Sequence, residues 1–333
     1  MMDNADPPCT PAIRLIVNAD DYGYFPCVSR GILQAAISGV VGATGILANG
    51  PQVAEQARWL DDCEDLDLGV HLNLTAGRPL TQALAERLDQ GRFPSPFALA
   101  ARLLTGRIGV ALVRDEWRAQ IESLLSLRPG VLPLRFLNSH EHVHMLPPLL
   151  PLAIGLAREY HIPFVRRVRV EWLPPYGASA LLRNLLMGTI ALVNSGQLPG
   201  SAGLWPACGR DARAPRTCPG RYYDQGHRAR PLFIGLSRSG RLDRAYLEAR
   251  FARLRPGKVY ELMCHPGTFD PAQITDPRLL AYHDWEGELA LLCGESFSGL
   301  CASYGIALTN FRALATTGDC PLDDCEGANP GDP

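Results

Sequence analysis

The chain has 333 residues, of which 47% are hydrophobic and 20% are charged, a composition that is ordinary for a globular protein. Its formal net charge is −2, from 32 basic and 34 acidic residues, which excludes a strong field that would steer the chain toward nucleic acid or anionic lipid. A small or neutral substrate fits this balance better than a polyanion does.

The first half of the chain alternates between apolar runs and segments whose apolar residues recur at helical spacing. The run RLIVNA, which ends next to charged residues, has the pattern of a buried strand. Gly39 is placed to end the helix that follows this strand. Strands are predicted at 14–19, 66–74 and 132–137, a further apolar run at 40–47, and helices at 28–38, 52–60 and 117–127.

The second half continues the same alternation. Pro147, Pro148 and Pro151 predict the start of a helix that runs to about Tyr160. Apolar residues alternate with arginines at 164–170, as in a half-buried strand. A strand is also predicted at 258–263, and helices at 246–254 and 285–301.

Strand–helix alternation without an internal repeat predicts an α/β fold with a mainly parallel sheet, open or closed into a barrel. We expect one domain at 12–315, with an irregular insertion or lid at 174–230, where Pro, Gly and Arg are frequent. Residues 1–11 and the acidic, Pro/Gly-rich residues 317–333 are expected to be disordered tails.

The most apolar internal segment, Ala178 to Val193, is interrupted by Arg183 and Asn184 and is too short and too polar to span a bilayer. We therefore predict no transmembrane segment and interpret these residues as a buried or interface helix. The interface alternative leaves a homodimer open, and contact with a membrane surface is the less favoured reading.

The N-terminus has no basic start followed by an apolar stretch, so no signal peptide is predicted. Ten cysteines are scattered without a CxxC pair, which favours reduced thiols and a cytoplasmic location. Cys208 and Cys218, in the irregular region, are the one pair considered for a disulfide, and the reduced state is favoured there too.

Chemically capable residues follow four of the predicted strands. Parallel α/β folds bring the carboxyl ends of their strands to one face, where active sites lie, so these groups should converge. The four segments are Asn18–Asp21, the run with His71 and Asn73, Asn138–His144, and Cys264–Gly267.

Each group has a simpler interpretation when it is taken alone. Adjacent carboxylates at Asp20 and Asp21 are costly without a cation, but they also suit an Asx turn or a helix N-cap. A lone strand histidine such as His71 is usually a satisfied core residue. The histidines at 140, 142 and 144 would face one side of an extended segment, or they form a His-rich surface loop.

One carboxylate and two imidazoles form a ligand set that leaves positions open for water and substrate. A divalent cation there would lower the pKa of a bound water and polarise a carbonyl oxygen. The second carboxylate could then serve as general base, and His265 could protonate a leaving group. These are the parts that amide hydrolysis needs.

Four motifs, IVNADDYG, GVHLNLTAGRP, SHEHVHM and ELMCHPG, resemble the YdjC-like carbohydrate deacetylase family in their order and together span residues 16–267. The resemblance implies a (β/α) barrel-like fold with its metal site at the carboxyl ends of the strands, and removal of acetyl from an N-acetylated sugar such as an oligosaccharide or glycolipid. It implies metal ligands at Asp21, His71 and His140, a general base at Asp20 and a general acid at His265. The family's metal is usually taken as Mg²⁺, and two imidazoles also suit Zn²⁺.

Three further residues are candidates for substrate binding or for supporting the ligands. Of His142 and His144, one could hydrogen-bond a metal ligand and the other could meet the sugar, or both could simply pack or face solvent. Glu261, on the last predicted strand before His265, could point into the barrel and orient a catalytic group, or it could pair with an arginine.

Two rival functions use the same ligands. A metal-dependent hydrolase could act on another amide or ester bond, including a phosphoester, but Arg78 is the only basic residue within the motifs, which disfavours phosphate handling. A non-catalytic sugar- or metal-binding protein would not need Asp20 and His265 together, so their joint presence favours catalysis.

Overall fold

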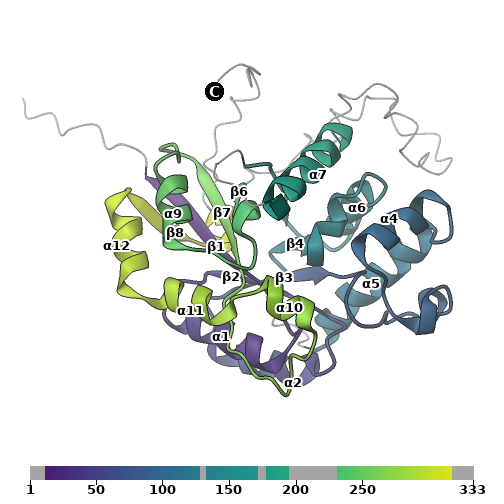
Figure 1. Cartoon of the computed structure of the whole chain (residues 1–333). Coiled ribbons are helices and arrows are strands. Elements are labelled where there is room, and N and C mark those ends of the chain that lie inside the picture. The colour runs from purple at the N-terminus through teal and green to yellow at the C-terminus, as the bar shows by residue number, and fades with distance from the viewer. Residues whose placement is uncertain (1–11, 128–132, 172–177, 195–230, 317–333) are drawn as a thin grey trace, which may run out of the picture.

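Eight parallel strands form one curled sheet at the centre of the molecule (Figure 1). The computed structural model describes residues 12–127, 133–171, 178–194 and 231–316. The predicted tails, most of the predicted insertion, and Cys208 and Cys218 lie outside these described residues. The strands are β1 (Ile13–Tyr22), β2 (Ala43–Ile46), β3 (Asp67–Leu72), β4 (Phe136–Ser139), β5 (Phe164–Val165), β6 (Leu232–Ile234), β7 (Val259–Cys264) and β8 (Ile306–Thr309).

The strand order is β5-β4-β3-β2-β1-β7-β6, with β8 also paired to β1. β7 lies along one edge of β1. β8 pairs with Ile13–Ile16 of β1, and β2 pairs with the residues from Asn18 onward. The three neighbours bury β1 almost completely and place its carboxyl end in the middle of the sheet edge. The barrel-like α/β fold predicted from the sequence is confirmed.

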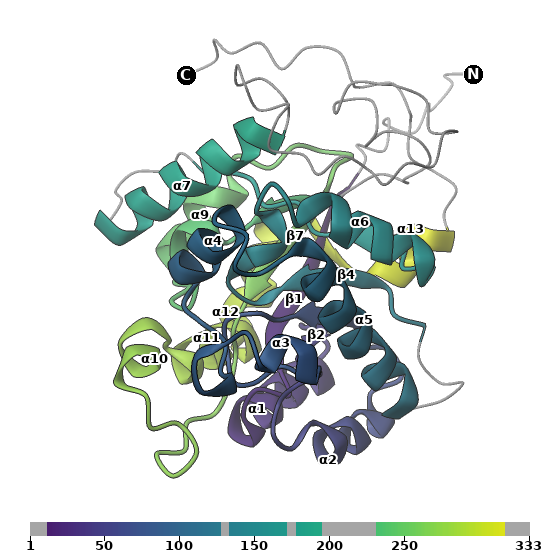
Figure 2. The same cartoon turned by 90° about the vertical axis from the view of Figure 1, so that its right-hand side faces the viewer.

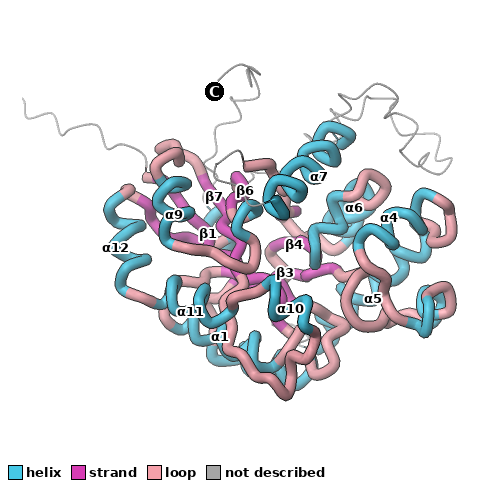
Figure 3. Tube along the Cα trace, viewed as in Figure 1, coloured by secondary structure: helices cyan, strands magenta, loops and turns pink. Residues whose placement is uncertain are grey.

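Helices surround the strands, as Figures 1 and 2 show from two directions and Figure 3 shows by element type. They bury a core in which Leu15, Ile32 and Trp117 are fully enclosed, and each such side chain contributes about 1.5–3 kcal/mol by its burial. The helices are α1 (Pro26–Ile37), α2 (Val53–Arg58), α3 (Gln82–Ala85), α4 (Pro96–Leu104), α5 (Val110–Leu127), α6 (Leu150–Glu159), α7 (Ala178–Asn194), α9 (Arg244–Phe251), α10 (Pro277–Tyr282), α11 (Trp285–Cys293), α12 (Glu295–Ser303) and α13 (Phe311–Thr316). Short 3₁₀ turns lie at η1 (Trp59–Asp62), η2 (Asp89–Gly91), η3 (His140–Met145) and η5 (Leu236–Arg238).

A β-bulge interrupts β1 at its carboxyl end. Ala19 pairs with Thr44 and Tyr22 pairs with Ile46, so three steps along β1 match two steps along β2. Asp21, within the bulge, has a φ of 71°, in the left-handed region. Neighbouring strand residues normally point to opposite faces, and the bulge changes the direction of the chain so that the side chains of Asp20 and Asp21 both reach the site described below.

Several predicted elements have other boundaries in the structure. The prediction that the three histidines lie on an extended segment is wrong. This segment folds as η3, in which Glu141 and His142 have φ values of 50° and 55°. The single helix predicted at 285–301 is two helices, because the chain is extended at Gly294. The strand predicted at 164–170 is β5, two residues long.

The described part of the region predicted as irregular forms the helix α7. A helix was expected from the apolar composition of this segment, and Asn184 and Met187 are buried in it. Several of its leucines are exposed, however, with Leu182 at 62%. Among the described residues, no helix is both long enough and apolar enough to cross a membrane.

Candidate metal centre and active site

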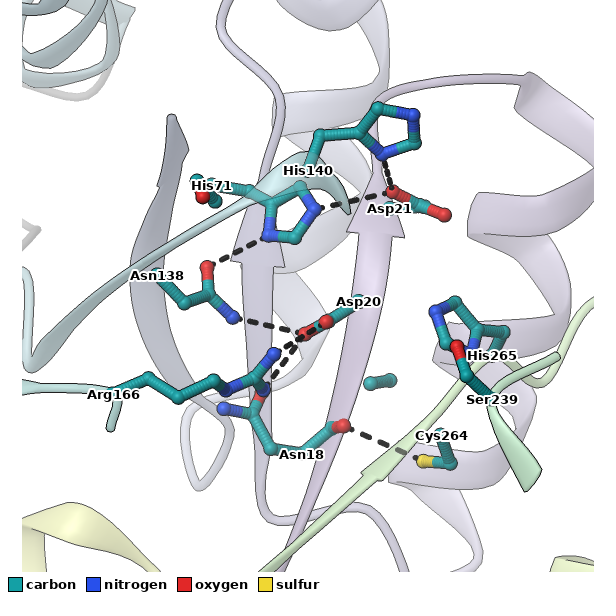
Figure 4. A network of polar contacts seen from close by, with 12 residues as sticks. Asn18, Asp20, Asp21, His71, Asn138, His140, Arg166, Ser239, Cys264 and His265 are labelled. Carbon is teal, nitrogen blue, oxygen red and sulfur yellow. Dashed lines mark hydrogen bonds and ion pairs between the residues drawn. The ribbon is translucent and has the colours of Figure 1, made fainter. Parts of the chain in front are cut away.

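Asp21, His71 and His140 meet at the carboxyl edge of the sheet, although β1, β3 and the start of η3 supply them separately (Figure 4). Each offers one ligand atom, and these atoms lie within 4.8 Å of one another. Asp21 Oδ1 lies 2.8 Å from His140 Nδ1 and 3.2 Å from His71 Nε2. All three residues are buried. The arrangement is a group of one carboxylate and two imidazoles that could hold a metal ion.

The hydrogen bonds of His71 test whether this group fits a cation. Asn138 Nδ2 donates to Asp20, so its Oδ1 faces His71 Nδ1 at 2.7 Å as an acceptor. His71 must then carry its proton on Nδ1, which leaves a lone pair on Nε2 directed at the Asp21 carboxylate. Two acceptors at 3.2 Å repel each other unless a cation or a proton lies between them. This donor set therefore fits a divalent metal.

A glycine on β2, Gly45, leaves the space that the side chains of His71 and Asn138 occupy. A Cβ at Gly45 would lie 2.9 Å from Asn138 Oδ1 and 3.2 Å from both His71 Cβ and His71 Nδ1. Such distances are shorter than carbon contacts in packed interiors, which are near 3.5–4.0 Å. The close approach of His71 and Asn138 therefore depends on the missing side chain.

Asp21 and His140 shift each other's pKa. Burial alone would lower the pKa of the His140 imidazole, but the charge and the hydrogen bond of Asp21 raise it to about 9. Burial would raise the pKa of Asp21, and His140 holds it well below the ordinary value. A metal at this site would therefore compete with a proton on His140.

Asp20 lies beside the ligand group in a buried ionic network. Arg166 Nη1 donates to Asp20 Oδ2 at 2.5 Å and Arg166 Nη2 donates to Asp20 Oδ1 at 2.9 Å. Arg166 Nε donates to Glu261 Oε1 at 2.7 Å, and Asn18 Nδ2 donates to the same oxygen at 2.8 Å. Burial would raise the pKa of Asp20, but the Arg166 guanidinium holds it below the ordinary value. Asp20 is thus kept ionised.

Arg166 is a site residue that the sequence analysis missed. The alternation at 164–170 predicted a half-buried strand with its arginines toward solvent, whereas Arg166 follows the short β5 and is only 3% exposed. Its position directly after a strand is the signal that could have found it, since the other site residues also lie in the last residues of a strand or directly after one. Of the two alternatives for Glu261, the structure shows the pairing with an arginine, and the same arginine also donates to Asp20.

Among the described residues, neither His144 nor His142 makes a hydrogen bond to the three proposed ligands, and His144 alone bonds to a residue of the ionic network. His144 Nδ1 lies 2.6 Å from Ser139 Oγ, and its Nε2 lies 3.0 Å from the backbone oxygen of Arg166. His144 therefore joins the segment after β4 to the segment after β5. The His142 ring meets Phe233 edge-on at 5.7 Å between centroids, and its buried Nδ1 has no hydrogen-bond partner.

His265 follows β7 and lies across Asp20 from Arg166 (Figure 4). Its backbone N–H donates to Glu288 Oε2 at 2.6 Å, which anchors the strand end to α11. Burial lowers the pKa of the His265 imidazole, and the carboxylates Asp21 and Asp20 oppose that shift without cancelling it. Burial also raises the pKa of Glu288 to about 8, although two backbone N–H groups favour its ionised form.

A curled parallel sheet with this ligand group at the carboxyl ends of its strands defines an α/β barrel-like protein with a candidate metal centre. The chain belongs to the YdjC-like family, because the model of that family, described as YdjC-like protein, matches residues 14–303. The resemblance seen in the sequence motifs is confirmed.

Two relatives and one solved structure illustrate the similarity. A carbohydrate deacetylase of Vibrio cholerae serotype O1 (strain M66-2) is 32% identical over 94% of this chain and 100% of that protein. One of Geobacillus stearothermophilus is 37% identical over 48% of this chain and 62% of that protein. A crystal structure from Enterococcus faecalis V583, provisionally described as a cellobiose-phosphate cleavage protein, has a TM-score of 0.62 and 23% identity, and covers 91% of this chain and 99% of that one. The last similarity concerns the fold alone.

Proposed function

We propose that this chain is a carbohydrate deacetylase that uses a divalent metal to remove the acetyl group from an N-acetylated sugar, giving acetate and the free amine. The observation that carries the proposal is the meeting of the Asp21, His71 and His140 ligand atoms beside the ionised Asp20. The names of the two relatives, both carbohydrate deacetylases, support the same reaction class.

The proposed ligands are Asp21, His71 and His140. A divalent ion bound there would lower the pKa of a water molecule and polarise the acetyl carbonyl. Mg²⁺ is expected from the family resemblance, and Zn²⁺ is the alternative that two imidazoles favour. The substrate's carrier, whether an oligosaccharide, a nucleotide or a lipid, is left open by this site.

Asp20 is the proposed general base. A carboxylate has about four lone-pair positions, and Asn138 and Arg166 occupy three of those on Asp20. The remaining position, on Oδ2, can take the proton of the attacking water. Because the Arg166 guanidinium is fixed on both Asp20 and Glu261, it holds this carboxylate ionised and in one orientation.

His265 is the proposed general acid. Once the water oxygen has bonded to the acetyl carbon, the C–N bond breaks as the imidazole donates a proton to the departing amine. Burial of His265 disfavours its charged form, which makes its imidazolium a strong proton donor once it is formed. The backbone hydrogen bond to Glu288 keeps this residue at the end of β7.

Hydrolysis of a phosphoester is the less favoured alternative. Arg166 is committed to two carboxylates, and the Nη1 of Arg78 donates to the backbone oxygens of Gln90 and Gly91. The Arg166 guanidinium is therefore not available for a phosphate group, and one nitrogen of Arg78 is already bound to backbone oxygens. A non-catalytic binding protein would not need an ionised base and a buried imidazole on either side of the substrate position.

The test is acetate release from N-acetylglucosamine oligosaccharides and acetylated glycolipids, with Mg²⁺ or Zn²⁺ and with a chelator. We expect release that the chelator abolishes, and loss of bound metal, measured by mass spectrometry, in the alanine variants of Asp21, His71 and His140. The exposed His161, which has a φ of 55°, supplies the control His161→Asn, since asparagine tolerates that conformation. Release that survives both chelator and ligand variants would contradict the metal, and no release from any acetylated sugar would contradict the reaction.

A further inference from the structure

A second imidazole, His283, lies beside the proposed general acid. His283 directly follows α10, and its backbone N–H donates to the Leu279 oxygen at 2.9 Å. The next residue, Asp284, donates its N–H to the Gly240 oxygen at 2.7 Å. The position of His283 is therefore fixed by backbone bonds to α10 and to the loop after η5, independently of the three proposed metal ligands.

Aromatic contacts hold the His283 ring. It stacks on the Trp285 ring, with centroids 4.7 Å apart and planes 16° apart. The Tyr282 ring meets it edge-on at 4.8 Å. A Cβ at Gly240 would lie 3.0 Å from His283 Nδ1, so a glycine with a φ of +77° lets the loop approach this nitrogen. His283 is only 8% exposed.

His283 and His265 each bury an unpaired nitrogen. Within the described part of the chain, the Nδ1 atoms of both residues lack a hydrogen-bond partner, an unfavourable state for buried polar atoms. Native structures rarely leave such atoms unpaired without a functional reason. In addition, His265 has no carboxylate on its ring nitrogens in any hydrogen bond of the described residues, although catalytic and metal-binding imidazoles usually have such a partner.

The ring centroids of His265 and His283 are 5.0 Å apart, with the planes tilted by 58°. A ring nitrogen lies about 1.1 Å from its own centroid, and an N–H···N bond spans about 2.9 Å, so two hydrogen-bonded imidazoles have centroids about 5 Å apart. The observed separation therefore leaves room for one hydrogen bond between the two rings, although none is formed in this arrangement. Because Trp285 and Tyr282 hold the His283 ring, forming this bond requires the His265 ring to turn toward His283.

We propose that His283 is a positioning residue for the proton donor, and that it accepts a hydrogen bond from Nδ1–H of His265. The proposal rests on the proposed function, since it gives His283 a part in proton donation by His265. The His265 imidazolium donates its Nε2 proton to the amine, keeps its Nδ1 proton on the His283 hydrogen bond, and ends as a neutral imidazole. No net charge moves to His283.

His283 suits this part because it stays neutral. Burial and the neighbouring His265 lower its pKa to about 3, so one of its nitrogens always carries a lone pair at neutral pH. A neutral acceptor fixes the tautomer of His265 without placing another negative charge beside Asp20 and Asp21.

The test compares His283→Phe, which keeps a stacked ring but no nitrogen, with His283→Gln, whose side-chain oxygen can accept the bond. We expect kcat for acetate release to fall about 10- to 100-fold in His283→Phe, the usual effect of losing such a partner, with KM and metal content within twofold. His283→Gln should recover most of that loss, and the control His161→Asn should leave kcat unchanged. Equal kcat in His283→Phe and the unmodified protein, or equal losses in both variants, would overturn the proposal.

A spectroscopic arm separates this proposal from the proposed function. In a ¹⁵N–¹H correlation spectrum of the labelled protein, His265 should be protonated at Nδ1, with a slowly exchanging proton that disappears in His283→Phe. An unmodified protein that keeps this signal but releases no acetate would contradict the reaction and leave the histidine pair supported. Acetate release without this signal would contradict the pair and leave the reaction supported.

Discussion

Replacing Arg166 with methionine removes the buried guanidinium that joins Asp20 to Glu261. The substitution deletes three N–H donors, at 2.5, 2.9 and 2.7 Å from their oxygens. Of the donors in the described residues, it leaves the two buried carboxylates the amides of Asn138 and Asn18. Removing one partner of a buried ion pair costs about 3–5 kcal/mol, because it leaves an uncompensated charge. That loss is comparable to much of a domain's total stability of about 5–15 kcal/mol.

The loss should depend on pH. Arg166 holds the folded-state pKa of Asp20 below its ordinary value, so its stabilising effect is present above about pH 4 and is lost as pH falls through the folded-state pKa. In Arg166→Met, burial raises the pKa of Asp20 instead, and the carboxyl group takes up a proton. We therefore expect a destabilisation of about 4 kcal/mol at pH 7 that becomes much smaller near pH 4.

Urea unfolding followed by tryptophan fluorescence at both pH values measures this effect. The matched control is Arg118→Met, which breaks an arginine–glutamate pair with Glu159 whose side chains are 33% and 45% exposed. Exposed pairs contribute about 0–1 kcal/mol, so the control should be nearly neutral. A loss below 1 kcal/mol for Arg166→Met at pH 7, or an equal loss at both pH values, would refute the electrostatic account of the network.

Three further predictions concern Asp20, His140 and Glu288. Asp20→Asn should bind metal and substrate normally but lower kcat by about 10²–10⁴, the contribution of a general base, and a normal kcat in steady-state assays would contradict that role. Because Asp21 raises the pKa of His140 to about 9, metal affinity measured by calorimetry should rise about tenfold per pH unit up to that value, and an affinity that is flat between pH 7 and 9 would count against it. Burial raises the pKa of Glu288 to about 8. The protonated carboxyl group therefore contributes stability that is fully present below the unfolded-state pKa near 4.3 and is lost as pH rises toward 8. In Glu288→Gln the urea concentration at the unfolding midpoint should change less between pH 5 and 8 than in the unmodified protein, and an unchanged pH dependence would contradict the shift.

Strand ends were the most informative feature of the sequence. Asp20, Asp21, His71, His140 and His265 all follow or end apolar runs, and a parallel sheet brings such ends to one edge whatever their separation along the chain. Periodicity alone was therefore enough to predict that these residues converge. Exact strand lengths were not needed, since shifts of a few residues leave each group at the same edge.

The partners of these residues were not predictable in the same way. Arg166 and Asp20 are 146 positions apart, and no local pattern couples them. The alternation around Arg166 is typical of a half-exposed strand, so the charge suggested solvent. Its burial depends on two carboxylates that only the folded sheet brings to it. Glu288, a helix residue, and His283, which precedes that helix, reach His265 through tertiary packing alone.

Backbone strain explains why the histidine segment was misinterpreted and what the site requires of the fold. Asp21, Glu141 and His142 all have positive φ values, although none is glycine, and each such residue costs about 1–3 kcal/mol. Strain of this size persists only where surrounding contacts over-determine the conformation. The conformation of Asp21 is fixed by the pairing of β1 with three strands. The conformation of η3 is fixed by His144, whose two ring nitrogens are both hydrogen-bonded. Of the three proposed ligands, Asp21 itself has strained backbone and His140 directly precedes the strained Glu141 and His142, so the contacts that hold these two segments also fix the positions of both ligands.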